Sequence, residues 1–206
     1  MSAPDTGLAD GRILIHIRHG ETDWNAEARL QGESDVPINA RGRDQARRNG
    51  ARLAEVLPLL ERTADGLDWL ASPLSRARET MEIVRSEMGL DPAGYRTEDS
   101  VRELAFGKWR GHTIKELKAV DPEAVRARRN DKWGFVPPGG ESYADLTVRV
   151  GAWLSGLERD SVVVAHGGVY RVLHHLIVGT PPAEAPGLHA PQDRIAVFRA
   201  GAVDLF

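Results

Sequence analysis

The sequence predicts an α/β fold of three layers, in which a mostly parallel central sheet carries helices on both faces. Short apolar runs rich in Val, Ile and Leu alternate with segments whose apolar residues recur at helical spacing. Such uninterrupted runs are typical of strands that are covered on both faces. A length of 206 residues and a hydrophobic fraction of 41% suffice for one core, and no internal segment reads as a linker. We expect a single domain over residues 1–206, with residues 1–10 as a flexible tail.

The first strand and helix are predicted at residues 12–18 and 40–57. "RILIHIR" is short and β-branched, and the turn residues "HGETDWN" follow it. The helix is expected to end before Pro58, which cannot continue the backbone ladder. Its inward stripe consists of Ala46, Leu53, Ala54, Val56 and Leu57.

A second strand and helix are predicted at residues 67–72 and 74–88. Pro73 suits a helix start, and Gly89 suits a helix end. The inward stripe of this helix consists of Ala77, Met81, Val84 and Met88.

The middle of the chain carries weaker signals. Residues 95–113 read as irregular, two short helices flank "VDPEA", and "WGFVPPGGES" reads as a loop. A helix then covers 142–157, with Leu146, Val150, Trp153, Leu154 and Leu157 inward.

The last elements complete the sheet. "SVVVAHG" at 161–167 predicts a buried strand, and a helix over 169–179 ends at Gly179. Two further strands are expected near 194–199 and 202–206.

The composition of the chain limits the kinds of partner that it is expected to bind. The formal net charge of −3 gives no general attraction to nucleic acid or to an anionic membrane. No apolar run approaches the roughly 20 residues that span a bilayer, and the absence of cysteine fits a reducing compartment. We expect a cytoplasmic protein without nucleic-acid or membrane partners. The sequence does not reveal its oligomeric state, and a homodimer stays open.

Basic side chains gather where the strands of this sheet are predicted to end. Arg18 and His19 follow the first strand, His166 follows the strand at 161–167, and Arg76 lies near the start of the helix after Ser72. Ligands of open parallel sheets bind at these carboxyl ends. Two imidazoles and two guanidiniums suit a tetrahedral dianion held by charge-assisted hydrogen bonds.

These residue types also predict a reaction. Neighbouring arginines should lower the pKa of His19, which leaves a neutral nitrogen able to attack phosphorus. Arg18, Arg76 and a protonated His166 would balance the charge of the phosphoryl group. Glu103, a partly desolvated carboxyl in "VRELAFG", is the expected proton donor to the leaving oxygen.

Each of these residues also has an ordinary structural interpretation when it is taken alone. A strand-end arginine or histidine is often only hydrogen-bonded, and a lone glutamate is usually solvated. His174 and His175 are expected to pack or to face solvent, and His16 to face a helix. The arginines at 41, 43, 47, 48 and 52 are interpreted as the solvated side of a helix.

Six segments together carry a resemblance to a known family. They are "IRHGETDWN", "LQGESDVPINARGRDQA", "ASPLSRARET", "VRELAFGKWRGHT", "PGGESYADL" and "VVVAHGGVYRVL". In this order they closely resemble the histidine phosphatase superfamily, also called phosphoglycerate mutase-like, over about residues 13 to 178.

The resemblance implies a role for each matching residue. His19 would be the phosphorylated nucleophile, and Glu103 the proton donor. The phosphate would be held by Arg18, Arg76 and His166, with help from Asn25 and weaker contributions from Thr22 and the backbone at Gly167. The substrate would be a small phosphorylated metabolite, and neither a metal nor another cofactor is implied.

Within this family the chain resembles the branch of broad-specificity and α-ribazole phosphatases. Cofactor-dependent mutases carry more chain between the glutamate motif and the last helix, whereas this sequence has only residues 104–138 there. Lys108 and Arg110 stand where members of that branch often have an acidic residue. We therefore hypothesise that the pair favours substrates with a second anionic group. His112 is the one loop histidine expected near the substrate.

Three other functions stay open at this point. A cofactor-dependent mutase would share the same residues, and a non-catalytic phosphate-binding module would keep the fold without turnover. A metal-dependent hydrolase would use His16, His19, His166 and His174, although no HExxH or comparable ligand spacing supports it.

Overall fold

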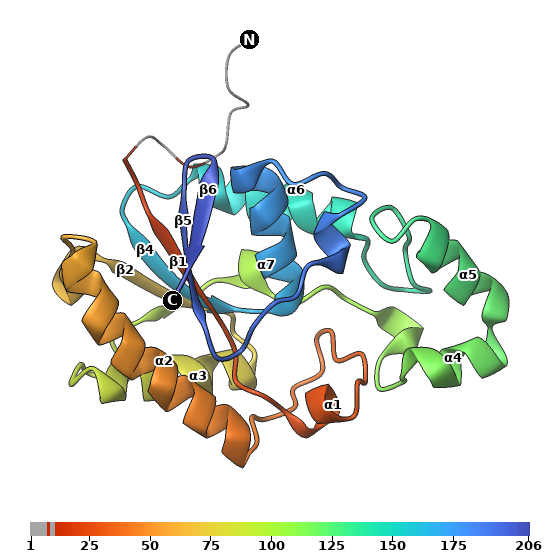
Figure 1. The fold of residues 1–206 in the computed structure, drawn as a ribbon. Coiled ribbons are helices and arrows are strands. Elements are labelled where there is room, and N and C mark those ends of the chain that lie inside the picture. The colour runs from red at the N-terminus through yellow and green to blue at the C-terminus, as the bar shows by residue number, and fades with distance from the viewer. Residues whose placement is uncertain (1–7, 9–10) are drawn as a thin grey trace, which may run out of the picture.

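The computed structural model describes Leu8 and residues 11–206, so most of the predicted tail lies outside the described residues (Figure 1). Leu8 itself is buried against the apolar core. The described chain forms one six-stranded sheet in the order β3-β2-β4-β1-β5-β6. Its strands are β1 Leu14–Arg18, β2 Asp68–Ala71, β3 Arg96–Thr97, β4 Ser161–Ala165, β5 Ile195–Arg199 and β6 Ala202–Leu205.

The four strands β3, β2, β4 and β1 are parallel, whereas β5 pairs antiparallel with β1 and β6 antiparallel with β5. Helices lie on both faces of this sheet (Figure 1). They are α1 Asp23–Ala26, α2 Ala40–Leu59, α3 Ser75–Glu87, α4 Ile114–Val120, α5 Pro122–Asn130, α6 Tyr143–Ser155 and α7 Gly167–Leu173. The predicted three-layer α/β class is confirmed.

Alternation along β1 shows how one strand serves two apolar layers. Ile15 and Ile17 are fully buried among residues of α2 and α3, whereas Leu14 points to the opposite layer with residues of α6 and α7. Every residue of β4 is buried, as expected for a central parallel strand. The carboxyl ends of β1 and β4 are therefore held rigidly side by side.

Helix α2 differs from its prediction at its end. It continues through Pro58 to Leu59. A proline in the last turn removes only one hydrogen bond, and the Leu60 N–H donates to the carbonyl of Val56, so the helix ends beyond Pro58. Ala54 is exposed, so it does not belong to the inward stripe.

Two short elements occur where the sequence predicts turns or irregular chain. Helix α1 follows the first strand, and its N-terminal Thr22 forms a capping box with Asn25. Strand β3 contributes only two residues at the sheet edge. The helix expected at 169–179 begins at Gly167 and continues as a π-helical turn to Gly179, whose φ of +79° ends it.

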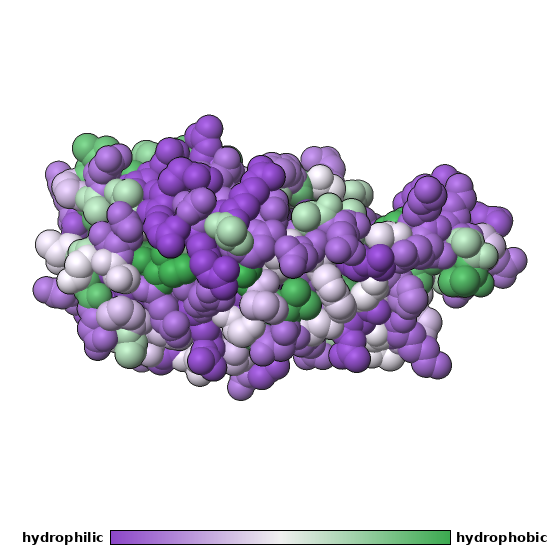
Figure 2. All heavy atoms as spheres, turned by 90° about the horizontal axis from the view of Figure 1, so that it is seen from below, coloured by the Kyte–Doolittle hydropathy of each residue, from purple (hydrophilic) through white to green (hydrophobic). Residues whose placement is uncertain are grey.

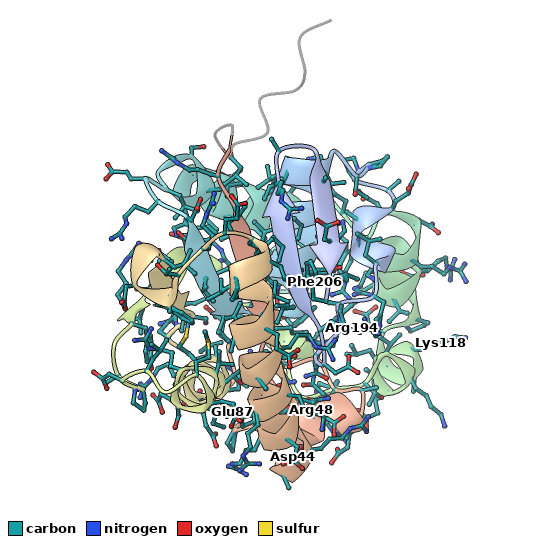
Figure 3. All side chains as sticks on the ribbon, turned by 60° about the vertical axis from the view of Figure 1, so that its left-hand side comes forward. Asp44, Arg48, Glu87, Lys118, Arg194 and Phe206 are labelled. Carbon is teal, nitrogen blue, oxygen red and sulfur yellow. The ribbon has the colours of Figure 1, made fainter. Side chains whose placement is uncertain are left out.

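The surface is mostly hydrophilic in the view of Figure 2. Figure 3 shows Asp44 and Arg48 on the outer side of α2, where both are exposed. Arg43 and Arg47 on this helix pair with Glu79 and Asp44, as expected for a solvated helix side. No helix among the described residues combines the length and apolar character that crossing a membrane requires.

Candidate active site

The predicted nucleophile His19 stands directly after β1. The parallel pairing of β1 with β4 sets Arg18 opposite Ala165, and the His19 N–H donates to the Ala165 carbonyl at 2.9 Å. His166 follows β4 at the same sheet edge, and its ring centroid lies 5.2 Å from that of His19. The topology thus brings together two histidines that are 147 positions apart in the sequence.

One hydrogen bond determines which nitrogen of His19 is available. Its Nδ1 lies 2.8 Å from the carbonyl oxygen of Gly20. A carbonyl only accepts, so Nδ1 carries the hydrogen and the lone pair of the neutral ring lies on Nε2. Burial, followed by the charges of Arg76 and Arg18, lowers the pKa of His19 well below 6.5. The predicted direction is confirmed, but burial is a larger cause than the arginines.

Close backbone packing holds this turn in place. A Cβ on Gly20 would lie 2.3 Å from the Gly42 carbonyl oxygen, so α2 can pack against the turn only because residue 20 is glycine. The Gly20 N–H also donates to the buried hydroxyl of Thr80, which in turn donates to the Arg76 carbonyl. Thr80 therefore connects the histidine turn to α3, a role that its sequence position does not reveal.

Arg76 is fully buried near the start of α3. Its Nη1 and Nη2 donate to the carbonyls of Ser34 at 2.6 Å and Gly32 at 2.7 Å. Burial lowers its pKa to about 10, so the guanidinium stays charged at neutral pH. Its Nε has no hydrogen-bond partner within the described chain. The backbone of residues 32–34 thus orients a fixed cation.

Arg18 supplies the second guanidinium. Its Nη1 donates to the Ala190 carbonyl at 2.6 Å, and its buried Nε has no partner within the described chain. Burial lowers its pKa to about 10, against the opposing attraction of Glu103. Arg18 and Arg76 therefore each have an Nε–H group near the histidine pair that no protein acceptor binds within the described chain.

The protonated form of His166 is predicted for the site with a phosphoryl group bound, and in the free protein its protonation state is different. Burial, followed by the charges of Arg76, lowers its pKa well below 6.5, so in the free protein it is neutral rather than protonated. Its Nε2 lies 2.7 Å from the Ser72 hydroxyl at the end of β2. The sequence places Ser72 near a strand end but does not predict this contact.

Glu103 reaches the site from the segment after β3. Its Oε1 accepts hydrogen bonds from the N–H of Gly168 at 3.0 Å and of Leu104 at 2.9 Å. A Cβ at position 168 would lie 2.3 Å from that oxygen, so the contact requires glycine. The carboxylate is also close enough to attract Arg18 and Arg76. The predicted acid is therefore held beside the cations.

Asn25 and Thr22 stand at the start of α1. Asn25 Oδ1 accepts from the Thr22 N–H and hydroxyl, both at 3.2 Å, which leaves the amide NH₂ free to donate elsewhere. Gln192 Nε2 donates to the same Oδ1 at 3.2 Å and to the His19 carbonyl at 3.0 Å. Sequence reasoning missed Gln192, because it lies in a loop near residue 194 with no motif of its own.

The structure does not bring every predicted residue to this cluster. Lys108 and Arg110 are exposed and line a surface hollow with Glu33 and Phe106. The side chain of His112 is 52% exposed and lies beside Glu116. His174 packs edge-on against the ring of Tyr170, as expected for a packing residue.

His16 is buried behind the cluster, where burial lowers its pKa to about 3. Its ring lies 5.6 Å from that of Tyr170, in α7, so the prediction that it faces a helix is confirmed. Among the described residues, no group of three or more His, Asp or Glu side chains is arranged to hold a metal ion.

The buried histidines predict how stability depends on pH. His16, His19 and His166 are neutral in the folded protein, whereas in the unfolded chain each binds a proton below about pH 6.5. The unfolded state then binds more protons, so stability is lost as pH falls. We expect the unfolding free energy to fall by about 1.4 kcal/mol per pH unit per histidine well below pH 6.5. Urea unfolding between pH 7 and 5.5 in a phosphate-free buffer measures this, and a flat profile would contradict it.

The fold and the site define a class of α/β proteins in which histidines and arginines gather at the carboxyl edge of a mostly parallel sheet. Residues 14–201 match the histidine phosphatase superfamily (branch 1), and the chain belongs to that family. The resemblance seen in the sequence is thereby confirmed.

Two curated relatives show the range of names within the family. A glucosyl-3-phosphoglycerate phosphatase of Mycolicibacterium vanbaalenii is 34% identical over 190 residues, which cover 86% of this chain and 79% of the relative. Phosphoglycerate mutase-like protein 4 of Arabidopsis thaliana is 35% identical over 177 residues, which cover 82% and 73%.

A solved structure from Escherichia coli, provisionally assigned as an alpha-ribazole-5'-P phosphatase, superposes with a TM-score of 0.77. It is 25% identical, and the match covers 96% of this chain and 95% of that one. Both the fold and the resemblance to this branch agree with the prediction.

Proposed function

We propose that the protein is a metal-independent phosphomonoesterase that acts on small phosphorylated metabolites through a phosphohistidine intermediate at His19. The observation that carries this proposal is the hydrogen bond from Nδ1 to the Gly20 carbonyl, which leaves Nε2 as a neutral nucleophile within reach of the charges of Arg76 and Arg18. Phosphatases among its relatives support the same reaction type.

In the first step, Nε2 of His19 attacks phosphorus and the ester P–O bond breaks. The leaving oxygen takes the proton of Glu103, which acts in its acid form in this step. Arg18 and Arg76 balance the charge on the equatorial oxygens, and the amide NH₂ of Asn25 donates to one of them. Because bound phosphate is anionic, its arrival favours the protonated form of His166, which then adds a further donor.

In the second step, water attacks the phosphohistidine and the N–P bond breaks. The Glu103 carboxylate takes one proton of that water, which restores the acid for the next cycle. Inorganic phosphate leaves, and His19 returns to its neutral form. Thr22, by capping α1, and the backbone at Gly167 complete the proposed phosphate site. A cytoplasmic location is part of the same proposal, supported by the absence of cysteine.

A mutase is the second candidate, because several relatives carry mutase or mutase-like names. It differs in the fate of the phosphohistidine, which passes to a second acceptor instead of water. The same residues serve both reactions, so only kinetics separates them.

Release of inorganic phosphate from p-nitrophenyl phosphate and from phosphorylated metabolites, with and without a chelator, tests the proposal. We expect chelator-resistant turnover that needs no bisphosphate primer. Turnover lost with chelator would indicate a metal-dependent hydrolase, and turnover seen only after priming would indicate a mutase. Binding of phosphate without any turnover would indicate a binding module.

A further inference from the structure

The segment "PGGESYADL" contributes to the family resemblance, but the proposed reaction gives it no role. It leads into α6, and Glu141 within it forms an ion pair with Arg149 on that helix. We propose that Glu141 and Arg149 are a positioning pair, which holds the chain around Glu103 so that its carboxyl group can reach the leaving oxygen. This proposal rests on the proposed function and adds two positioning residues to it.

The chain around Glu103 needs such support because it belongs to no strand. Two short 3₁₀ turns, Asp99–Val101 and Gly107–Trp109, flank it. The end of β1, by contrast, is fixed by ladder hydrogen bonds to the strands on both sides. Val101 and Leu104 anchor the segment in the core. Apolar contacts are non-directional, however, so they do not by themselves orient a carboxyl group.

Arg149 binds this segment through two backbone carbonyls. Its Nη1 donates to the Ser100 carbonyl at 2.6 Å, and its Nη2 donates to the Glu103 carbonyl at 3.3 Å. The same guanidinium makes a bidentate pair with Glu141, from Nε to Oε1 at 2.8 Å and from Nη2 to Oε2 at 2.9 Å. A bidentate pair fixes the plane of the guanidinium. Glu141 therefore sets the direction in which Arg149 donates to the segment.

Glu141 also binds the same chain two residues beyond Glu103. Its backbone N–H donates to the Ala105 carbonyl at 2.8 Å, and its Oε2 accepts from the Ala105 N–H at 3.4 Å. A Cβ on Gly140 would lie 2.5 Å from that carbonyl oxygen, so this close approach requires glycine. Contacts from the pair thus lie on both sides of the Glu103 side chain along the backbone.

Helix α6 gives the pair a rigid base. A capping box between Ser142 and Asp145 fixes the first turn of this helix, and its inner face is buried. The side chains of Arg149 and Glu141 are 27% and 19% exposed, so water competes for their hydrogen bonds less than it does at the open surface. The fixed position of α6 is therefore passed on to Glu103.

The proposed role is specific to one step of the reaction. Both carboxylate oxygens of Glu141 are engaged by Arg149 and Ala105, so Glu141 orients the acid and does not itself supply the proton. The need for the Glu103 proton rises with the basicity of the leaving oxygen, which is low for p-nitrophenolate and high for an alkoxide. Loss of the pair should therefore slow the transfer most when the leaving oxygen is basic.

A series of three substrates tests the pair. They are p-nitrophenyl, phenyl and benzyl phosphate, whose leaving oxygens are increasingly basic. We expect Arg149→Met to lower kcat/KM by about 10- to 100-fold for benzyl phosphate and by no more than about threefold for p-nitrophenyl phosphate. The ratio kcat/KM reports phosphoryl transfer to His19 alone, whereas kcat also includes the hydrolysis step in which Glu103 acts again.

Two further variants separate this role from a general structural one. The double variant Glu141→Gln, Arg149→Met should lose no more than Arg149→Met alone, because the two residues act as one unit. Arg62→Met is the matched control. Arg62 pairs with Asp160, just before β4 at the opposite end of the sheet, and these side chains are 33% and 16% exposed. This control should keep the parental ratios between the substrates, whatever it loses in urea unfolding.

Amide hydrogen exchange without substrate gives a second measurement. In Arg149→Met the amides of residues 103–106 should exchange at least about fivefold faster than in the parent, while those of β4 stay unchanged. If the parent shows no turnover, the proposed function fails, and exchange alone decides whether the pair holds this segment. Unchanged exchange there, an equal loss for all three substrates, additive losses in the double variant, or altered substrate ratios in Arg62→Met would overturn the proposal.

Discussion

Replacing His19 with alanine should lower kcat/KM for p-nitrophenyl phosphate by at least about 10⁴-fold. His19 is the expected nucleophile because the Gly20 carbonyl holds its Nδ1 and leaves the lone pair on Nε2, whereas His166 contacts Ser72 through Nε2 and keeps a buried Nδ1 without a partner. Steady-state phosphate release by the parent and the variant measures the loss.

The matched control is His112→Ala, which removes an exposed histidine beside Glu116. It should keep activity within about twofold, because surface substitutions away from the site have small effects. Near-parental turnover in His19→Ala would mean that another group is the nucleophile.

Replacing Arg76 with lysine should lower kcat/KM by about 10²- to 10³-fold, even though the positive charge is kept. The guanidinium donates to two carbonyls at once, and a lysine ammonium on a flexible stem cannot reproduce that planar geometry. The carbonyls of Gly32 and Ser34 would lose part of their hydrogen bonding, which costs about 1–3 kcal/mol for each one left unpaired.

Arg78→Lys is the control, because Arg78 lies on the same helix but is exposed. Activity and urea unfolding should both stay near parental values in that variant. If Arg76→Lys kept full activity while losing stability, Arg76 would be a structural residue rather than part of the phosphate site.

The sequence predicts correctly those strands and helices whose local pattern of apolar residues is sufficient to specify them. The run "SVVVA" is buried on both sides in β4, and the stripe from Leu146 to Leu154 in α6 faces the core. The two-residue strand β3 has no such pattern, because its two residues are exposed and its pairing with β2 depends on a partner distant in sequence. The predicted end of α2 was wrong. Proline breaks the interior of a helix, but it is tolerated in the last turn of α2.

The site could be predicted only where its residues stand in motifs. His19, Arg76, Glu103 and His166 were named from strand ends and from the ordered resemblance, and the structure brings them together. Gln192 and Thr80 could not be found, because their importance lies in single hydrogen bonds to the histidine turn. The neutral state of His166 in the free protein depends on its burial, and the residues around it in the sequence do not reveal how deeply it is buried.

The pair formed by Glu141 and Arg149 was missed because its contacts join segments that are distant in sequence. Glu141 stands within a recognisable motif, but only the carbonyls of Ser100 and Glu103 show what Arg149 binds. The sequence drew attention instead to Lys108 and Arg110, which also stand within a recognisable motif.

Trapping the covalent intermediate tests the central claim most directly. The protein is mixed rapidly with p-nitrophenyl phosphate, quenched in alkali to preserve a phosphorus–nitrogen bond, digested and analysed by mass spectrometry. A phosphoryl group on Nε2 of His19, formed and lost at rates that match turnover, is the result we predict. Turnover without any phosphorylated peptide, or a phosphoryl group on His166 instead, would contradict the account.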